Sequence, residues 1–226
     1  MITGLTRLVG LLRDPLADSL SPRMQNAAFA AVGLDWAYVP LGVEPDDLER
    51  AISGLAALGF VGANVTTPHK VAAAGLVETE LGSVNTLVVR DGRILGFSTD
   101  AAIAEELRPE RPVVVGGGGA AAAWLEVLRH ARQFTRRGTW PPVVDDADVV
   151  VNATSERDAV VVEVGPGQTL VDLPYPATAT ARAAEAAGAR VVDGLDVLVA
   201  QGAAAFELWT GVPAPVEVMR AAVRGA

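Results

Sequence analysis

The sequence predicts an α/β protein made of two α/β lobes. Half of its 226 residues are hydrophobic, and alanine, glycine and valine are abundant, a composition that suits close packing of helices on sheets. Short apolar runs alternate with amphipathic stretches of helical length, which is the pattern of a mostly parallel sheet. After residue 112 the alternation starts again with a new apolar run. This restart indicates the second lobe.

The first lobe is expected to begin with three strands and two helices. Pro22 can occupy the first turn of a helix that runs to about Val32, and Ser21 before it suits the N-cap position. The three apolar strands and the amphipathic second helix are expected at residues 7–12, 36–43, 60–65 and 44–59.

A short helix and a hairpin complete the first sheet. The helix is expected from about Pro68, where the chain leaves the third strand. The segment 84–97 consists of two apolar runs separated by Asp91 and Gly92. Because this dipeptide favours a two-residue turn, the segment predicts a β-hairpin.

The second lobe repeats the alternation of strands and helices. Its strands are expected at residues 113–115, within 147–155 and within 167–175. A helix, a strand and a further helix should follow within 178–211, and a last helix at about 215–224. The expected domains are 1–102 together with about 203–226, and 103–202, with the C-terminal helices returning to the first lobe.

Composition narrows the classes of function. Lys and Arg total 18 against 27 Asp and Glu, and the net charge of −9 argues against nucleic acid as a partner. The chain has no cysteine, and its two histidines, His69 and His130, are far apart, so no metal site is expected. No apolar run reaches the roughly 18 residues of a membrane span, and the N-terminal run is too short for a signal peptide. We expect a soluble, cytoplasmic protein.

A glycine-rich loop opens the second lobe. Gly116, Gly118 and Ala121 form the pattern G-x-G-x-x-A between a strand and a helix, where backbone N–H groups can approach a pyrophosphate. About 20 residues further on, NAD-binding proteins carry an acidic residue, but this chain has Arg136 and Arg137. Guanidinium groups suit a 2′-phosphate, so a Rossmann-like lobe that binds NADP is predicted, with NAD possible. A flexible turn and solvated surface arginines are the alternative interpretation.

The adenosine half of this second lobe is abridged. Gly138, Trp140, Pro141 and Pro142 occupy the segment before the next strand. A full helix does not fit between Gly138 and that strand.

Polar residues gather at the expected strand ends and helix starts of the first lobe. In parallel sheets, ligands bind outside the carboxyl ends of strands. Hydroxyls and amides at these points suit a ligand that has several hydroxyls or a carboxylate, and a lysine paired with an aspartate could transfer a proton. Taken singly, each residue could instead be a cap, a turn residue or a solvated charge. The residues are Ser19, Ser21, Asn64, Thr66, Lys70, Asn85, Thr99 and Asp100.

Seven segments resemble those of shikimate dehydrogenases in order and spacing. They are "SLSPRMQNAAF", "GANVTTPHK", "SVNTL", "GFSTDA", "GGGGA", "NATS" and "DGLDVLVAQGAAAFELWTG", and they span nearly the whole chain. The resemblance implies an oxidoreductase of the shikimate pathway, which leads to chorismate and the aromatic amino acids. It would catalyse the NADP-dependent, reversible reduction of 3-dehydroshikimate to shikimate in a cleft between the lobes, as a monomer or homodimer.

The resemblance also implies a role for each matched residue. Lys70 is matched to the catalytic lysine and Asp100 to its acidic partner, whereas His69 falls at a variable position. The matched substrate ligands are Ser19 and Ser21 at the carboxylate, Tyr175 near it, and Thr66, Asn85 and Gln201 at the hydroxyls. The matched cofactor ligands are Gly116, Gly117, Gly118, Gly119 and Ala120 at the pyrophosphate, Arg136 and Arg137 at the 2′-phosphate, and Gly194 near the nicotinamide.

The chain departs from the family pattern at several points. Gln25 stands where the family usually has histidine, and Ser98 where it usually has asparagine. The segment between Lys70 and Asn85 is shorter than usual, and so is the adenosine half. Two alternatives stay open: a quinate/shikimate dehydrogenase that uses NAD, and a catalytically weak binding protein with the same fold.

Overall fold

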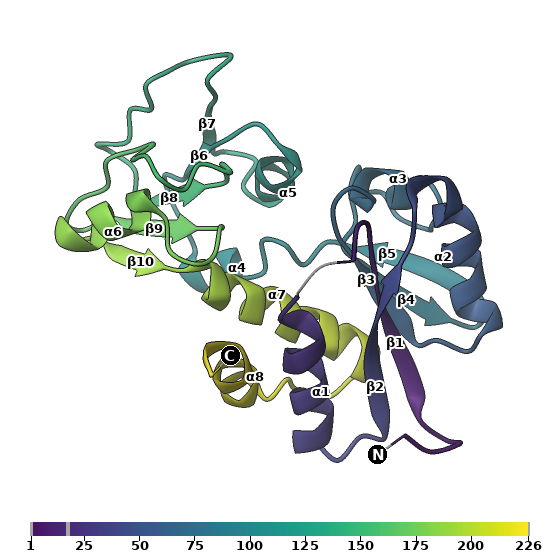
Figure 1. Ribbon diagram of the computed structural model, residues 1–226. Helices are drawn as coiled ribbons and strands as arrows, with labels where there is room; N and C mark the ends of the chain where they lie inside the picture. The colour runs from purple at the N-terminus through teal and green to yellow at the C-terminus, as the bar shows by residue number, and fades with distance from the viewer. Residues whose placement is uncertain (1, 17–18, 226) are drawn as a thin grey trace. The chain divides into compact units, whose positions relative to one another are not determined.

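The chain folds into two compact units (Figure 1). The computed structural model describes residues 2–16 and 19–225. Unit 1 contains the described residues up to Thr99 and from Val199 onward, and unit 2 contains Asp100–Leu198. The chain returns to unit 1 within helix α7 (Gly194–Thr210). Each unit combines a sheet with helices, so the predicted α/β class is confirmed.

Unit 1 is built on a five-stranded sheet with the order β2-β1-β3-β4-β5. The central strand β1 pairs in parallel with β2 and β3, whereas β4 pairs antiparallel with β3 and with β5. The strands are β1 (Arg7–Arg13), β2 (Trp36–Gly42), β3 (Gly62–Val65), β4 (Thr86–Arg90) and β5 (Arg93–Phe97). The predicted hairpin is confirmed: Asp91 and Gly92 have φ angles of 53° and 75°, as a two-residue type I′ turn requires.

Helices cover both faces of this sheet (Figure 1). They are α1 (Ser21–Ala31), the 3₁₀ turn η1 (Pro45–Asp47), α2 (Leu48–Ala57), α3 (Lys70–Ala74), the C-terminal part of α7, and α8 (Val216–Arg224). The C-terminal helices pack on α1: the rings of Phe29 and Phe206 stack at 5.5 Å, and Arg23 Nη2 donates to Gly225 O at 2.8 Å. Trp209 Nε1 ties α7 to the sheet by donating to Leu87 O at 2.9 Å.

The start of α1 differs from the prediction. The N-cap residue is Leu20, and Ser21 is the first helical residue rather than the cap. The hydroxyl oxygen of Ser19 accepts the backbone N–H of Ser21 at 3.3 Å. The hydroxyl that accepts a backbone N–H at the start of this helix therefore belongs to Ser19 and not, as predicted, to Ser21.

Unit 2 is built on an entirely parallel sheet with the order β10-β9-β8-β6-β7. Its strands are β6 (Val113–Val115), β7 (Arg132–Phe134), β8 (Val149–Asn152), β9 (Thr169–Asp172) and β10 (Arg190–Val192), and its helices are α4 (Ala104–Leu107), α5 (Gly119–Val127) and α6 (Ala179–Ala186), followed by the start of α7. The core is aliphatic, with Val113, Val150 and Leu170 fully buried. The chain runs from β6 to β7 on one side and then to β8 on the other. A topological switch point, where open α/β sheets bind ligands, therefore lies between β6 and β8.

As expected from the sequence, no helix lies between Gly138 and β8. All residues from 135 to 148 are described, and they form turns and bends without a helix. The side chain of Gln168 holds this segment, because its Nε2 donates to Val144 O at 2.7 Å and to Ala147 O at 2.9 Å. Backbone carbonyls of the loop are thereby satisfied without a helix.

Candidate active site

A buried amide in unit 1 organises the polar residues at the sheet edge. Asn85 is 3% exposed. Its Oδ1 accepts the hydroxyl of Thr86 at 3.0 Å and the backbone N–H of Thr99 at 2.8 Å. Its Nδ2 donates to Thr99 Oγ1 at 3.1 Å and to Gln201 Oε1 at 3.4 Å. These bonds use both ends of the amide, so they fix the orientation of Asn85 and connect the end of the hairpin to α7.

Asn64 and Tyr38 form a second set of hydrogen bonds next to Asn85. The Tyr38 hydroxyl donates to Asn64 Oδ1 at 2.8 Å, and Asn64 Nδ2 lies 3.0 Å from both Asn85 O and Thr86 Oγ1. Burial raises the pKa of Tyr38, so its hydroxyl stays a neutral donor. Asn64 therefore positions Asn85. Tyr38 was not singled out from the sequence, because it lies within an apolar strand and carries no motif, and Thr86 belongs to the matched segment "SVNTL" but was given no role of its own.

Lys70 and His69 have different surroundings. His69 is 1% exposed and its Nε2 lies 2.8 Å from Val43 O, so the imidazole serves the core. Lys70 is the first residue of α3 and is partly buried, and its backbone oxygen accepts the N–H of Val84 at 3.1 Å. Because Val84 directly precedes Asn85 in the chain, this bond holds the backbone of Lys70 close to that of Asn85.

The remaining predicted substrate residues divide between the two units. Thr66 follows β3, and its backbone oxygen accepts the N–H of His69 at 2.9 Å, which begins the turn into α3. Asp100 directly follows Thr99 and is the first residue of unit 2. Tyr175 also lies in unit 2, in the loop after β9, and is 40% exposed. The structure therefore assigns Ser19, Ser21, Thr66, Lys70, Asn85 and Gln201 to unit 1, and Asp100, Tyr175 and Gly194 to unit 2.

Two of the predicted cofactor glycines allow close approach of another backbone segment, and a third faces open space. Gly116 has a φ of +138°, and a Cβ there would lie 2.7 Å from Ala153 O. A Cβ at Gly194, the first residue of α7, would lie 2.6 Å from Leu173 O. Gly118 is the N-cap of α5, and a Cβ on it would meet no protein atom within 4 Å. The space above Gly118 is therefore open to a ligand at the N-terminus of a nine-residue helix.

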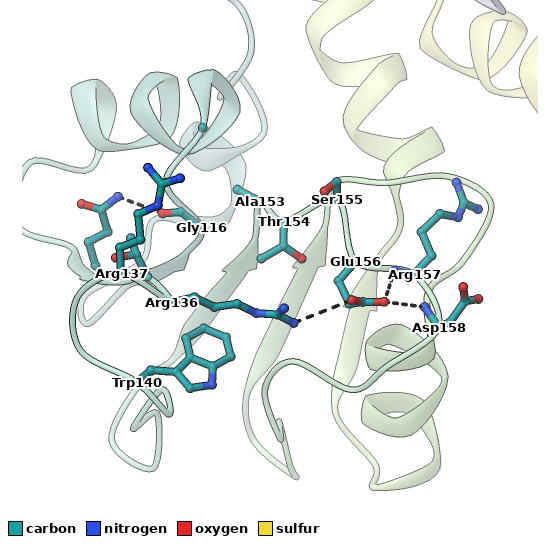
Figure 2. A pocket seen from close by; sticks show the side chains of 14 residues that line it. Gly116, Arg136, Arg137, Trp140, Ala153, Thr154, Ser155, Glu156, Arg157 and Asp158 are labelled. Carbon is teal, nitrogen blue, oxygen red and sulfur yellow. Dashed lines mark hydrogen bonds and ion pairs between the residues drawn. The ribbon is translucent and has the colours of Figure 1, made fainter.

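A pocket of about 820 Å³ lies at this switch point (Figure 2). Its walls are β7 and the loops that follow β6, β7 and β8. The lining residues are Gly116, Gly117, Gly118, Gln133, Thr135, Arg136, Arg137, Trp140, Ala153, Thr154, Ser155, Glu156, Arg157 and Asp158. The structure thus brings both predicted arginines together with the glycine loop, and Gly119 and Ala120 follow in the first turn of α5. Glu156 and Trp140 were missed as site residues, although Glu156 directly follows the matched segment "NATS", in the loop after β8.

Charges of both signs meet inside this pocket. Arg136 Nη2 lies 3.7 Å from Glu156 Oε2, and its guanidinium carbon lies 5.7 Å from the centroid of the Trp140 ring. Backbone N–H groups of Asp158 and Ala159, followed by that of Arg157 and the charge of Arg136, hold the pKa of Glu156 below its usual value. Glu156 is therefore ionised at neutral pH.

Within residues 2–16 and 19–225, no three acidic or histidine side chains are grouped so that they could hold a metal ion. No helix in the same part of the chain is long and apolar enough to cross a membrane.

The chain resembles known proteins along nearly its whole length. The family of shikimate dehydrogenase substrate binding domains matches residues 11–87, and that of shikimate 5′-dehydrogenase C-terminal domains matches residues 194–224. A shikimate dehydrogenase (NADP(+)) of Anaeromyxobacter sp. (strain Fw109-5) is 42% identical over 272 aligned positions, covering 99% of this chain and 98% of the relative. Since 272 positions exceed the 226 residues of this chain, the relative carries segments that this chain lacks.

Solved structures give the same picture. A shikimate dehydrogenase crystallised in complex with NADP+ has a TM-score of 0.87 and 29% identity, covering 100% of this chain and 97% of that one. The enzyme from Thermus thermophilus in complex with NADP(H) and shikimate has a TM-score of 0.83 and 28% identity, covering 97% and 99%. Sequence identity over the full length and agreement of the fold lead to one conclusion: the chain belongs to the shikimate dehydrogenase family.

Proposed function

We propose that this chain is an NADP-dependent shikimate dehydrogenase, which reversibly reduces 3-dehydroshikimate to shikimate. The observation that carries the proposal is the hydrogen-bonded set of Asn85, Thr99 and Gln201. Lys70 is bonded through its backbone to the residue before Asn85, and Asp100 follows Thr99. A general dinucleotide-binding protein has no need of this arrangement, which suits a polyhydroxylated substrate. The full-length similarity to enzymes named for this activity supports the same function.

Lys70 is the proposed proton donor. As the substrate carbonyl carbon is reduced, its oxygen takes a proton from the Lys70 ammonium, and in the reverse direction the neutral amine accepts that proton. Asp100 is the acidic partner that holds the lysine in position. NADP supplies the hydride chemistry when it is bound.

The other unit 1 residues are proposed to bind and orient the substrate. Ser19 and Ser21, at the start of α1, offer hydroxyl groups to the carboxylate, and Tyr175 is assigned near it. Thr66, Asn85 and Gln201 offer hydroxyl and amide groups to the ring hydroxyls. Asn85 and Gln201 are already hydrogen-bonded to each other, so they would meet the substrate in a fixed orientation and lose little entropy on binding.

Unit 2 is proposed to bind NADP in the pocket beside the glycine loop. Gly116, Gly117, Gly118, Gly119 and Ala120 would hold the pyrophosphate at the N-terminus of α5. Arg136 and Arg137 would bind the 2′-phosphate, and Gly194 would lie near the nicotinamide. The open space over Gly118 and Gly119 fits this assignment.

Initial rates on two substrates with two cofactors test the proposed function. We expect kcat/KM to be highest for shikimate with NADP. A higher value for quinate with NAD would instead identify a quinate dehydrogenase. Thermal stabilisation by shikimate without turnover on either substrate would identify a binding protein.

Two further properties are proposed from the family. We expect a cytoplasmic enzyme that acts on small molecules as a monomer or homodimer. Light scattering of the purified chain distinguishes the two oligomeric states, and a larger assembly would contradict both.

A further inference from the structure

Glu156 places a negative charge inside the pocket that the proposed function assigns to NADP (Figure 2). Its carboxylate faces Arg136, with 3.7 Å between Oε2 and Nη2. Figure 2 shows the Arg136 side chain extended past Trp140 toward Glu156. Arg136 is one of the two arginines assigned to the 2′-phosphate. An internal carboxylate therefore occupies one side of a guanidinium that the cofactor needs.

This carboxylate is held in place by its own loop. Glu156 Oε1 accepts the backbone N–H groups of Arg157 and Asp158 at 3.1 Å and that of Ala159 at 3.3 Å. Three donors to one oxygen restrain the side chain far more than a single surface ion pair does. When a phosphate approaches Arg136, Glu156 has to give up these bonds in order to move away. It therefore stays near the incoming charge.

The loop itself is anchored to unit 2. Arg157 Nη1 donates to Tyr175 O at 3.0 Å and Arg157 Nη2 to Pro176 O at 2.9 Å, and Ala179 donates its N–H to Arg157 O at 2.8 Å. Glu156 is thus part of a fixed wall of the pocket. Its side chain is 33% exposed and that of Arg136 is 66% exposed, so solvent weakens their attraction, and the loop hydrogen bonds rather than the ion pair hold Glu156 in place.

We propose that Glu156 is a specificity-determining residue of the cofactor pocket, which competes with the 2′-phosphate for Arg136 and thereby reduces the preference for NADP over NAD. The inference rests on the proposed function, because it requires the adenosine end of the cofactor to lie beside Arg136. A 2′-phosphate bound to Arg136 gains the guanidinium charge but meets the fixed carboxylate. Arg137 lines the same pocket, and the described residues place no carboxylate against it, so it remains the main ligand of the phosphate. NAD carries an uncharged 2′-hydroxyl at this point, so it meets no charge repulsion from Glu156.

Binding of two nucleotides that differ only at the 2′ position tests this proposal. Adenosine 2′,5′-bisphosphate and adenosine 5′-monophosphate are titrated calorimetrically into the full-length wild-type protein and into Glu156→Gln. Glutamine keeps an oxygen that can accept the loop N–H groups, removes the charge and replaces the other oxygen by an NH2 group of similar size. We expect the variant to bind the bisphosphate about fivefold more tightly and the monophosphate within about twofold of wild type.

Two controls separate the pair from a general field effect. Asp158→Asn removes the same charge from the same loop, and we expect it to change the bisphosphate affinity by less than about twofold. In an Arg136→Gln background, adding Glu156→Gln should likewise change the bisphosphate affinity by less than about twofold, because the guanidinium for which carboxylate and phosphate compete is absent. Equal tightening by Asp158→Asn, or persistence of the effect without Arg136, would overturn the proposal.

The wild-type titrations distinguish this inference from the proposed function. If wild type binds both nucleotides but Glu156→Gln leaves their ratio unchanged, the role of Glu156 is wrong and the cofactor pocket stands. If wild type binds neither nucleotide, the assignment of NADP to this pocket fails, and the role of Glu156 fails with it.

Discussion

Asn85 illustrates at the residue scale how one buried amide can position a binding site. Its carbonyl and amino groups are both used within unit 1, by Thr86, Thr99 and Gln201. Burying an amide is costly unless it is hydrogen-bonded, and once bonded it has one orientation. The same bonds that stabilise the sheet edge therefore preset the groups that would meet the substrate.

Tyr38→Phe tests this support. The change removes the hydroxyl that donates to Asn64 Oδ1 and leaves a part-buried acceptor unpaired, which costs about 1–3 kcal/mol. We expect a lower Tm and a raised KM for shikimate, with kcat changed less than KM. Thermal unfolding and steady-state kinetics measure these quantities.

Thr210→Val is the matched control for Tyr38→Phe. It removes a hydroxyl that donates to Phe206 O at 2.8 Å in the same unit, outside the Asn85 set. It should lower Tm without changing KM. An unchanged KM in Tyr38→Phe would show that Asn85 does not depend on this support.

Asp148 illustrates at the element scale how a short strand is connected to its neighbour. Its carboxylate precedes β8 and accepts the backbone N–H groups of Glu110 at 2.6 Å, Arg111 at 2.9 Å and Val149 at 2.8 Å. It thereby ties the segment that enters β6 to the start of β8. Partial burial pushes the pKa of Asp148 upward, but these N–H groups outweigh it, and the pKa lies below its usual value.

Asp148→Asn should therefore destabilise the protein in a pH-dependent way. A depressed pKa in the folded state contributes stability above the unfolded pKa of about 4, and this contribution is lost as the pH falls through the folded pKa. We expect the free energy of unfolding to be about 1–2 kcal/mol lower in the variant than in wild type at pH 7. This difference should become smaller below about pH 4. Denaturant unfolding at several pH values measures the difference.

Asp145→Asn provides the comparison for Asp148→Asn, because it removes an exposed carboxylate from the same loop. It should leave the free energy of unfolding nearly unchanged at pH 7. A loss at Asp148→Asn that is constant across the pH range would contradict the role given to its charge.

Sequence patterns predicted the elements well where local chemistry decides them. The Asp91-Gly92 turn and the strand–glycine–helix unit at Gly116 depend on positive φ angles or close approach, which glycine makes visible in a sequence. The cap of α1 was assigned wrongly, because a serine suits several positions around a helix start, and only the backbone shows that Leu20 is the cap. The contacts of Tyr38 with Asn64 and of Glu156 with Arg136 join segments that are distant in the sequence, and sequence periodicity does not predict such contacts.

At the scale of the whole molecule, the proposed substrate and cofactor residues are distributed over two units. Unit 1 holds Lys70 and most of the proposed substrate ligands, and unit 2 holds the pocket beside the glycine loop. The abridged segment 135–148 belongs to unit 2. The segment without a helix therefore lies in the unit proposed to bind the cofactor, and unit 1, with most of the proposed substrate ligands, does not contain it.

Hydrogen exchange measured by mass spectrometry tests this division. We expect NADP to slow amide exchange in the segments 116–120, 135–140 and 153–158 of unit 2, because these carry the proposed pyrophosphate and 2′-phosphate contacts. Shikimate should slow exchange in the segments 64–70 and 199–202 of unit 1. Protection of unit 1 alone by NADP would refute the assignment of the pocket.

The central claim is that Lys70 carries the proton in NADP-dependent oxidation of shikimate, and Lys70→Ala measures it most directly. Its neighbour provides the control: His69→Gln should lower Tm, since His69 is buried and bonded to Val43 O, but should keep kcat close to wild type. For Lys70→Ala we predict that kcat falls about a thousandfold while the Kd for NADP stays within about twofold of wild type. A kcat for Lys70→Ala equal to that of wild type would contradict the account.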